Sequence, residues 1–169
     1  EPDLHLDLHV VVAVVQIWLN WILHLLEDKN QGGGLENVDS FYFYSDKALE
    51  LAEEKNQKNT SAELNYLLGS IYYNKSIAEA RSGNYLQALW TSNQMKSYLE
   101  EAVKIKPDFY DAFLGLGLYN FALSQIPSSL EWAANLVGIN ADKEKGLELV
   151  RKSVVKGKLS KIDAQYYLS

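Results

Sequence analysis

The chain has 169 residues, which is long enough for one domain with a substantial buried core. Its 22 acidic and 16 basic side chains give a net charge of −6 without long runs of either sign, which argues against a nucleic-acid partner because such proteins neutralise phosphates. Cysteine is absent, so disulfides, thiolate metal ligands and thiol nucleophiles are excluded. The compartment stays undetermined, with bacterial cytoplasm and periplasm both open for a soluble protein.

The most apolar stretch is VVVAVVQIWLNWILHLL at residues 10–26, in which 14 of 17 residues are apolar. A membrane-spanning helix needs about 20 such residues. The three exceptions, Gln16, Asn20 and His24, recur every fourth residue and form a polar stripe on one side of a helix. We therefore expect a helix that is buried in the protein over most of its circumference, and no integral membrane span.

Helical periodicity, with apolar residues three and four apart, dominates the rest of the chain. Gly83 predicts the end of one helix, and Pro107 predicts the end of the next. The glycines of QGGGLE, at 31–36, predict a turn, with a hinge as the alternative. Eight helices are predicted, at about 9–28, 36–56, 61–82, 84–105, 109–124, 128–137, 141–156 and 161–168.

One sequence pattern recurs along these helices. LGSIY at 68–72 is echoed by LG at 116–117, 48 residues later, and between them lie GNYLQA at 83–88 and AVKIKP at 102–107. In these residues the chain resembles the tetratricopeptide (TPR) repeat family. The repeat of that family has about 34 residues, with Leu-Gly-x-x-Tyr on its first helix, a Gly-x-Tyr-x-x-Ala turn, an Ala on its second helix and a closing Pro.

The spacing of the pattern is longer than in the family. Gly69 and Gly83 are 14 residues apart, as are Ala88 and Ala102, and each interval is about seven residues longer than in the family. Seven residues make almost two helical turns, so the same face stays inward with a drift of about 20°. Equal insertions in two antiparallel helices preserve their pairing and account for the 48-residue interval.

The resemblance implies an all-α protein of antiparallel helix hairpins, stacked as a TPR-like α-solenoid with a right-handed superhelix. Residues 1–169 would form a single domain. Its parts are a divergent first hairpin at about 10–56, an extended hairpin at 61–107, a third hairpin at 109–156, and the start of a further helix at 161–169. Gly69 and Gly117 would let neighbouring helices approach closely. The gaps between helices would be filled by the large side chains Tyr72, Trp90, Leu99 and Phe113.

In TPR arrays the first helix of each hairpin lines the concave side. The resemblance therefore implies a peptide-binding groove that is lined by Glu63, Tyr66, Ser70, Tyr73, Asn74, Ile77, Arg81, Asp111, Leu114, Leu118 and Phe121. TPRs that bind chaperone C-termini clamp a carboxylate with Lys, Asn and Arg, which these positions do not match. A groove rich in Tyr, Leu and Phe suits an apolar or aromatic peptide or a partner helix. The alternative is that these aromatic side chains are part of the core.

Motifs for chemistry are lacking: the sequence has no phosphate-binding loop, nucleophile elbow or metalloprotease signature. We therefore predict no catalytic residue, no cofactor and no metal site. Asp3, His5, Asp7 and His9 alternate with leucines and could hold a divalent metal on an extended strand, but a frayed terminus is the favoured interpretation. His24 is expected to have a structural role.

The leading hypothesis is a non-enzymatic scaffold that binds a protein or peptide through the concave groove of a TPR-like array. The alternative is a structural or assembly module. In that case the apolar first helix would dock on a second copy of the chain, giving a homo-oligomer, or on a membrane surface. The sequence does not identify the partner.

Overall fold

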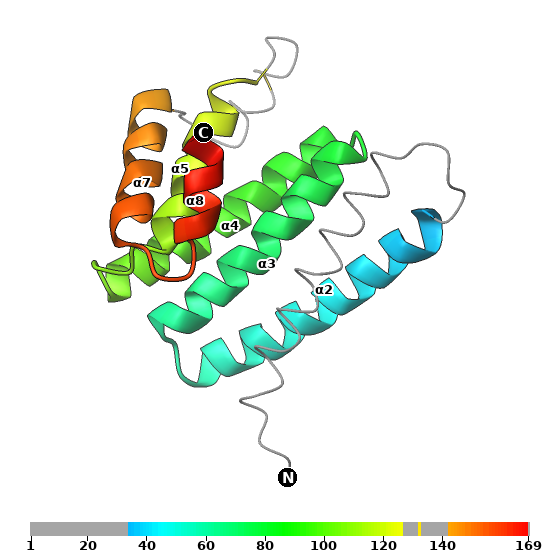
Figure 1. Ribbon diagram of the computed structural model, residues 1–169. Helices are drawn as coiled ribbons and strands as arrows, with labels where there is room; N and C mark the ends of the chain where they lie inside the picture. The colour runs from blue at the N-terminus through cyan, green and yellow to red at the C-terminus, as the bar shows by residue number, and fades with distance from the viewer. Residues whose placement is uncertain (1–33, 127–131, 133–141, 169) are drawn as a thin grey trace.

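The computed structural model describes residues 34–126, 132 and 142–168, and within them the chain is all-α, with no strand. Its helices are α2 (Gly34–Lys58), α3 (Ala62–Arg81), α4 (Tyr85–Ile105), α5 (Ala112–Leu123), α7 (Lys143–Lys156) and α8 (Lys161–Leu168) (Figure 1). Each begins and ends within three residues of its prediction. The apolar stretch at 10–26, with the N-terminal Asp and His residues, lies outside the described residues, as does most of the helix predicted at 128–137.

Local signals in the sequence account for the helix boundaries. The Ser61 hydroxyl accepts a hydrogen bond from the backbone N–H of Leu64 at 3.1 Å and so caps the start of α3. Gly83 follows the end of α3 with a φ of +81°, a left-handed conformation that side chains with a Cβ disfavour. Pro107 follows the end of α4, and Asp142 caps α7 by accepting from the N–H of Lys145 at 3.0 Å.

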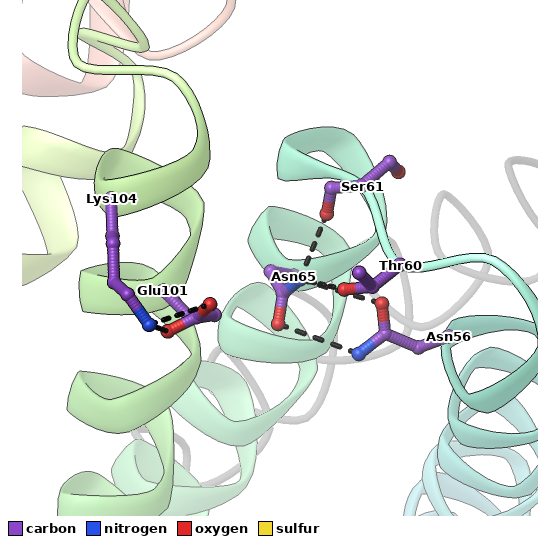
Figure 2. A network of polar contacts seen from close by, with 6 residues as sticks. All are labelled: Asn56, Thr60, Ser61, Asn65, Glu101 and Lys104. Atoms are coloured by element: carbon purple, nitrogen blue, oxygen red, sulfur yellow. Dashed lines mark hydrogen bonds and ion pairs between the residues drawn. The ribbon is translucent and has the colours of Figure 1, made fainter.

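A polar network fixes the turn between α2 and α3 (Figure 2). The buried amide of Asn65 donates to the carbonyl of Ser61 at 2.8 Å and to the hydroxyl of Thr60 at 3.1 Å. It also exchanges two longer bonds, each of 3.4 Å, with the amide of Asn56 at the end of α2. Because a buried amide must be satisfied, this network holds α2 antiparallel along α3.

Consecutive helices pack against one another along the chain. The closest pair is α3 and α4, which are antiparallel and have 20 and 21 residues. α5 packs on α4 and also touches α3, α7 packs on α5, and α8 packs on α7. The pair formed by α5 and α7 is shorter than the long pair formed by α3 and α4, with 12 residues in α5 and 14 in α7. The loop end of the long pair, at the turn between α3 and α4, therefore reaches beyond α5 (Figure 1).

Glycines set the distance between helices, as predicted. A Cβ atom at Gly69 would lie 2.5 Å from the side chain of Leu99, which is buried between α3, α4 and α5. Between α5 and α7, a Cβ at Gly117 would lie 2.7 Å from the carbonyl oxygen of Gly146. A Cβ at Gly146 would lie 2.8 Å from the carbonyl oxygen of Gly117. The two backbones therefore touch at this crossing, which only glycine permits.

One packing expectation is wrong. Trp90 does not fill a gap between helices, because half of its side chain, 50%, is exposed on α4. Tyr72 does occupy such a gap, and its ring stacks on that of Tyr98 at 5.6 Å. Leu99 and Phe113 also pack in the core, between α4 and α5. Trp90 therefore faces outward beside the core.

Candidate functional site

An apolar cavity of about 810 Å³ lies among α3, α4, α5 and α8. Seventeen described residues line it, and none of them carries a charged side chain, although 22% of the whole chain is charged. Its largest lining side chains are Tyr73, Tyr85, Met95, Tyr119, Phe121 and Tyr167. A cavity of this volume and composition is typical of a binding site for an apolar group.

The cavity lies beside the end of the α3–α4 pair that is nearer the Gly83 turn. Its floor comes from the second half of α3, including Ile77 and Ala80, and from the first half of α4, including Leu89. The glycine turn at Gly83 joins these two segments. Helix α5 ends at Leu123, so among the described helices it lies along only part of the α3–α4 pair. The cavity lies beside the part that α5 does not reach.

Several polar groups of the cavity wall have hydrogen-bond partners within the protein. The Ser76 hydroxyl donates to the carbonyl of Tyr73 at 2.7 Å, and the Ser92 hydroxyl donates to that of Leu89 at 2.8 Å. The Tyr119 hydroxyl donates to Asn93 at 3.4 Å. The wall therefore offers few unengaged hydrogen-bonding groups to a ligand.

A pair of tyrosines closes one edge of the cavity. The hydroxyls of Tyr73 on α3 and Tyr167 on α8 lie 2.8 Å apart and share a hydrogen bond. Burial, with the neighbouring Tyr167 hydroxyl, raises the pKa of Tyr73 above its ordinary value. Burial and the charge of Glu100 raise the pKa of Tyr119 to about 12. Both shifts move the pKa of these phenols further above neutral pH.

The structure brings four of the predicted groove residues together in this cavity: Tyr73, Ile77, Leu118 and Phe121. They come from α3 and α5. Lys143 of α7 lies outside the wall, with its ammonium 5.8 Å from the ring centre of Phe121. Of the groove residues that the resemblance implied, only these four line the cavity, and all four lie on α3 or α5.

The other predicted groove residues of α3 lie away from the cavity. Tyr66 packs against the ring of Phe109 at 5.3 Å, and burial with the charge of Asp111 raises the pKa of Tyr66 to about 12. The Ser70 hydroxyl donates to the carbonyl of Tyr66 at 2.8 Å. The remaining three residues are Glu63, which pairs with Lys106 at 3.3 Å, Asn74, which is buried, and Arg81, which is exposed at the end of α3.

Asp111 holds the turn between α7 and α8 instead of facing the cavity. One of its carboxylate oxygens accepts four hydrogen bonds of 2.8–2.9 Å, from the backbone N–H groups of Lys158, Leu159 and Ser160 and from the Ser160 hydroxyl. Burial alone would raise the pKa of Asp111, but these bonds together hold it below its ordinary value. Leu114 is buried nearby, in the cluster shared by α5, α7 and α8.

The part of the cavity wall that comes from α4 and from α8 was not predicted from the sequence. On α4 the missed residues are spaced three and four apart, so they share one helix face, and they include Tyr85, Leu89 and Met95. That spacing was a usable signal, because Tyr85 and Leu89 begin an apolar face at the turn. Tyr167 gives no comparable signal, since it meets Tyr73 across 94 residues of sequence.

Comparisons with known proteins give no family. No protein-family model matches this sequence, and no curated protein or solved structure is similar to it. In the part of the chain that the structure describes, no three His, Cys, Asp or Glu side chains cluster as metal ligands would. The same residues include no helix with the length and apolarity to cross a membrane. The apolar cavity is therefore the candidate functional site of the described residues.

Proposed function

We propose that the protein is a non-enzymatic scaffold of TPR-like helical hairpins that binds a segment of another protein in the cavity. The order of packing supports a TPR-like array, because each described helix packs on the next and α3 also meets α5, as the first helices of successive repeats do. The matched lengths of α3 and α4 agree with a seven-residue insertion in each.

The observation that carries the binding proposal is the uncharged wall of the cavity. General acid–base catalysis uses a group that titrates near the working pH, and the wall offers only tyrosine hydroxyls for that task. Burial raises the pKa of Tyr73 and Tyr119, which moves them further from that range. An apolar wall of this size instead favours recognition of apolar groups.

Exposed apolar side chains beside the cavity favour a protein as the ligand. Tyr85, Leu86 and Trp90 are 53%, 56% and 50% exposed and follow one another along α4. Tyr85 lines the cavity, and the other two lie on the adjoining flank of the helix. Large apolar and aromatic side chains that remain exposed together mark protein interfaces.

Site-specific photo-crosslinking tests this proposal in the native host. A benzophenone amino acid that replaces the exposed Tyr85 should form protein adducts, whereas the same group at Ile162, which is 78% exposed on α8, should not form them. The adduct should disappear when Ala122→Glu adds a charge at an exposed position of the cavity wall. Absence of a protein adduct at Tyr85, or identical adducts at both positions, would show that the cavity is not a protein-binding site.

A further inference from the structure

We propose that the segment bound in the cavity is an amphipathic α-helix of a partner protein, which inserts the apolar side chains of one face between α3, α4 and α5. This inference rests on the proposed function, because it names the kind of segment that the scaffold binds. Three features of the cavity carry it: its lack of charge, its engaged hydrogen-bonding groups and its apolar rim.

The absence of charge restricts which part of a partner can enter. None of the lining side chains is charged, and the raised pKa of Tyr73 keeps its phenol neutral. A carboxylate or ammonium group would lose its hydration on entering and would find no opposite charge there. Chain termini, acidic peptides and basic peptides are therefore disfavoured, and an uncharged apolar surface is favoured.

The hydrogen bonds of the wall distinguish a helix from an extended peptide. An extended segment brings an unpaired N–H and C=O with each residue, and burial of these groups without partners is unfavourable. Most of the wall is helical, so away from the helix ends its backbone groups are bonded within their own helices. Ser76 and Ser92 donate to backbone carbonyls of the wall. A helix satisfies its own backbone and presents only side chains.

The rim of the cavity distinguishes a helix from a small apolar molecule. A small molecule could fill the volume of about 810 Å³ and would leave Leu86 and Trp90 in water. A helix is about 10–12 Å across with its side chains, so it can fill the cavity with one row of residues and cover this flank with the next. Apolar residues at i, i+3, i+4 and i+7 would provide the anchors.

A pair of designed peptides tests the inference on the full chain. The probe is a labelled peptide of about 14 residues with blocked ends, leucines at helical spacing and equal numbers of Glu and Lys at the other positions. Its control has the same composition, with the leucines at alternate positions, so that they share one face only in an extended chain. We expect fluorescence anisotropy to show binding of the helical probe at least about tenfold tighter than binding of the control.

Two variants test whether the helical probe binds in the cavity. Ala122→Glu, at an exposed position that lines the cavity, should weaken probe binding by at least about tenfold. Ser97→Glu, at an exposed position of α4 outside the wall, should leave it unchanged. Circular dichroism should show the same helix content in both variants, which separates loss of binding from loss of folding.

The other outcomes overturn the inference in distinguishable ways. Equal binding of the two peptides, or no binding of either, together with a protein adduct at Tyr85, would retain the scaffold and refute the helical partner. Binding of palmitate without peptide binding or a protein adduct would refute both, because the occupant would then be a small apolar molecule. A lower mass of Ala122→Glu in light scattering, relative to the unsubstituted chain, would identify a second copy of this chain as the occupant.

Discussion

Helix packing differs between two regions of this chain. Packing is tight where α5 crosses α7 and loose at the loop end of α3 and α4. At the crossing, Gly117 and Gly146 bring two backbones into contact and leave no room for a Cβ atom. At the Gly83 end of the α3–α4 pair, the described helices leave a cavity of about 810 Å³. The first region is determined by the size of its residues, and the second by the lengths of its helices.

The two regions should differ in how well they tolerate larger side chains. Where two backbones are in contact, no free space remains between them, so even one added methyl group must push the helices apart. A cavity accepts added volume without displacing neighbours. Four substitutions test this contrast between the two regions, and they are given in order of decreasing expected loss of stability.

Gly146→Ala should have the largest effect. The new Cβ would meet two backbone atoms, the carbonyl oxygen of Gly117 at 2.8 Å and the nitrogen of Phe121 at 2.9 Å, and neither can rotate away. We expect a loss of about 3 kcal/mol in the free energy of unfolding, measured by urea denaturation. Gly115→Ala is the control, because its nearest neighbour is the flexible Leu99 side chain, and it should cost less. Equal losses would contradict the backbone-contact argument.

Asp111→Ala should rank second. It removes an acceptor of four hydrogen bonds and leaves the buried N–H of Ser160 without its partner. We expect a loss of about 2 kcal/mol by the same measurement. Asp111→Asn keeps an acceptor oxygen and should lose less. A neutral result for Asp111→Ala would show that the turn between α7 and α8 needs no such support.

The same carboxylate predicts a pH dependence. The pKa of Asp111 is lowered on folding, so its contribution to stability is fully present above its ordinary pKa of 3.8 and is lost as the pH falls from there through the lowered value. Denaturation curves between about pH 6 and pH 2 should therefore show a smaller acid-induced loss for Asp111→Asn than for the unsubstituted chain. Parallel curves would contradict this assignment.

Gly83→Ala should rank third. No atom lies within 4 Å of the new Cβ, so the effect isolates the cost of a φ of +81° for a residue with a side chain. We expect a loss of about 1 kcal/mol, measured as a fall in thermal midpoint. Gly83→Asn is the matched variant, because asparagine tolerates left-handed backbone, and it should lose less. Identical midpoints for the two variants would refute the conformational explanation.

Ala80→Leu should have the smallest effect. Ala80 lines the cavity, so the added side chain has room, and stability should stay within about 0.5 kcal/mol of the unsubstituted chain. The same substitution at Ala102, which is fully buried in the core, should cost about 1–3 kcal/mol. If Ala80→Leu were as costly as Ala102→Leu, the space would not be available to a ligand.

Much of the helical framework could be predicted from the sequence because its signals are local. Gly83 and the residues around Pro107 mark helix ends within a few positions, and side chains of the same helix define its apolar face. Trp90 shows the limit of this reasoning. Its spacing fits an apolar face, but whether a neighbouring helix covers that face depends on tertiary packing, and half of the side chain is exposed.

The cavity could be predicted only in part because it depends on distant pairs. Asp111 was expected to line a groove, but its partners lie 47 to 49 residues further along the chain and no local pattern links them. Tyr73 was also expected to line a groove and does line the cavity, but its partner Tyr167 is 94 residues away. The 14-residue intervals from Gly69 to Gly83 and from Ala88 to Ala102 are visible in the sequence. That the α3–α4 pair reaches beyond the shorter α5 required the structure.

The unequal lengths of the two helix pairs also affect how a partner could be positioned. A stack of identical units offers the same contacts at every step, so a bound chain could slip by one unit without losing any of them. Here 20 and 21 residues in α3 and α4 are followed by 12 and 14 in α5 and α7, so the described surface lacks translational symmetry. A ligand seated at the step between them would have one register and one polarity.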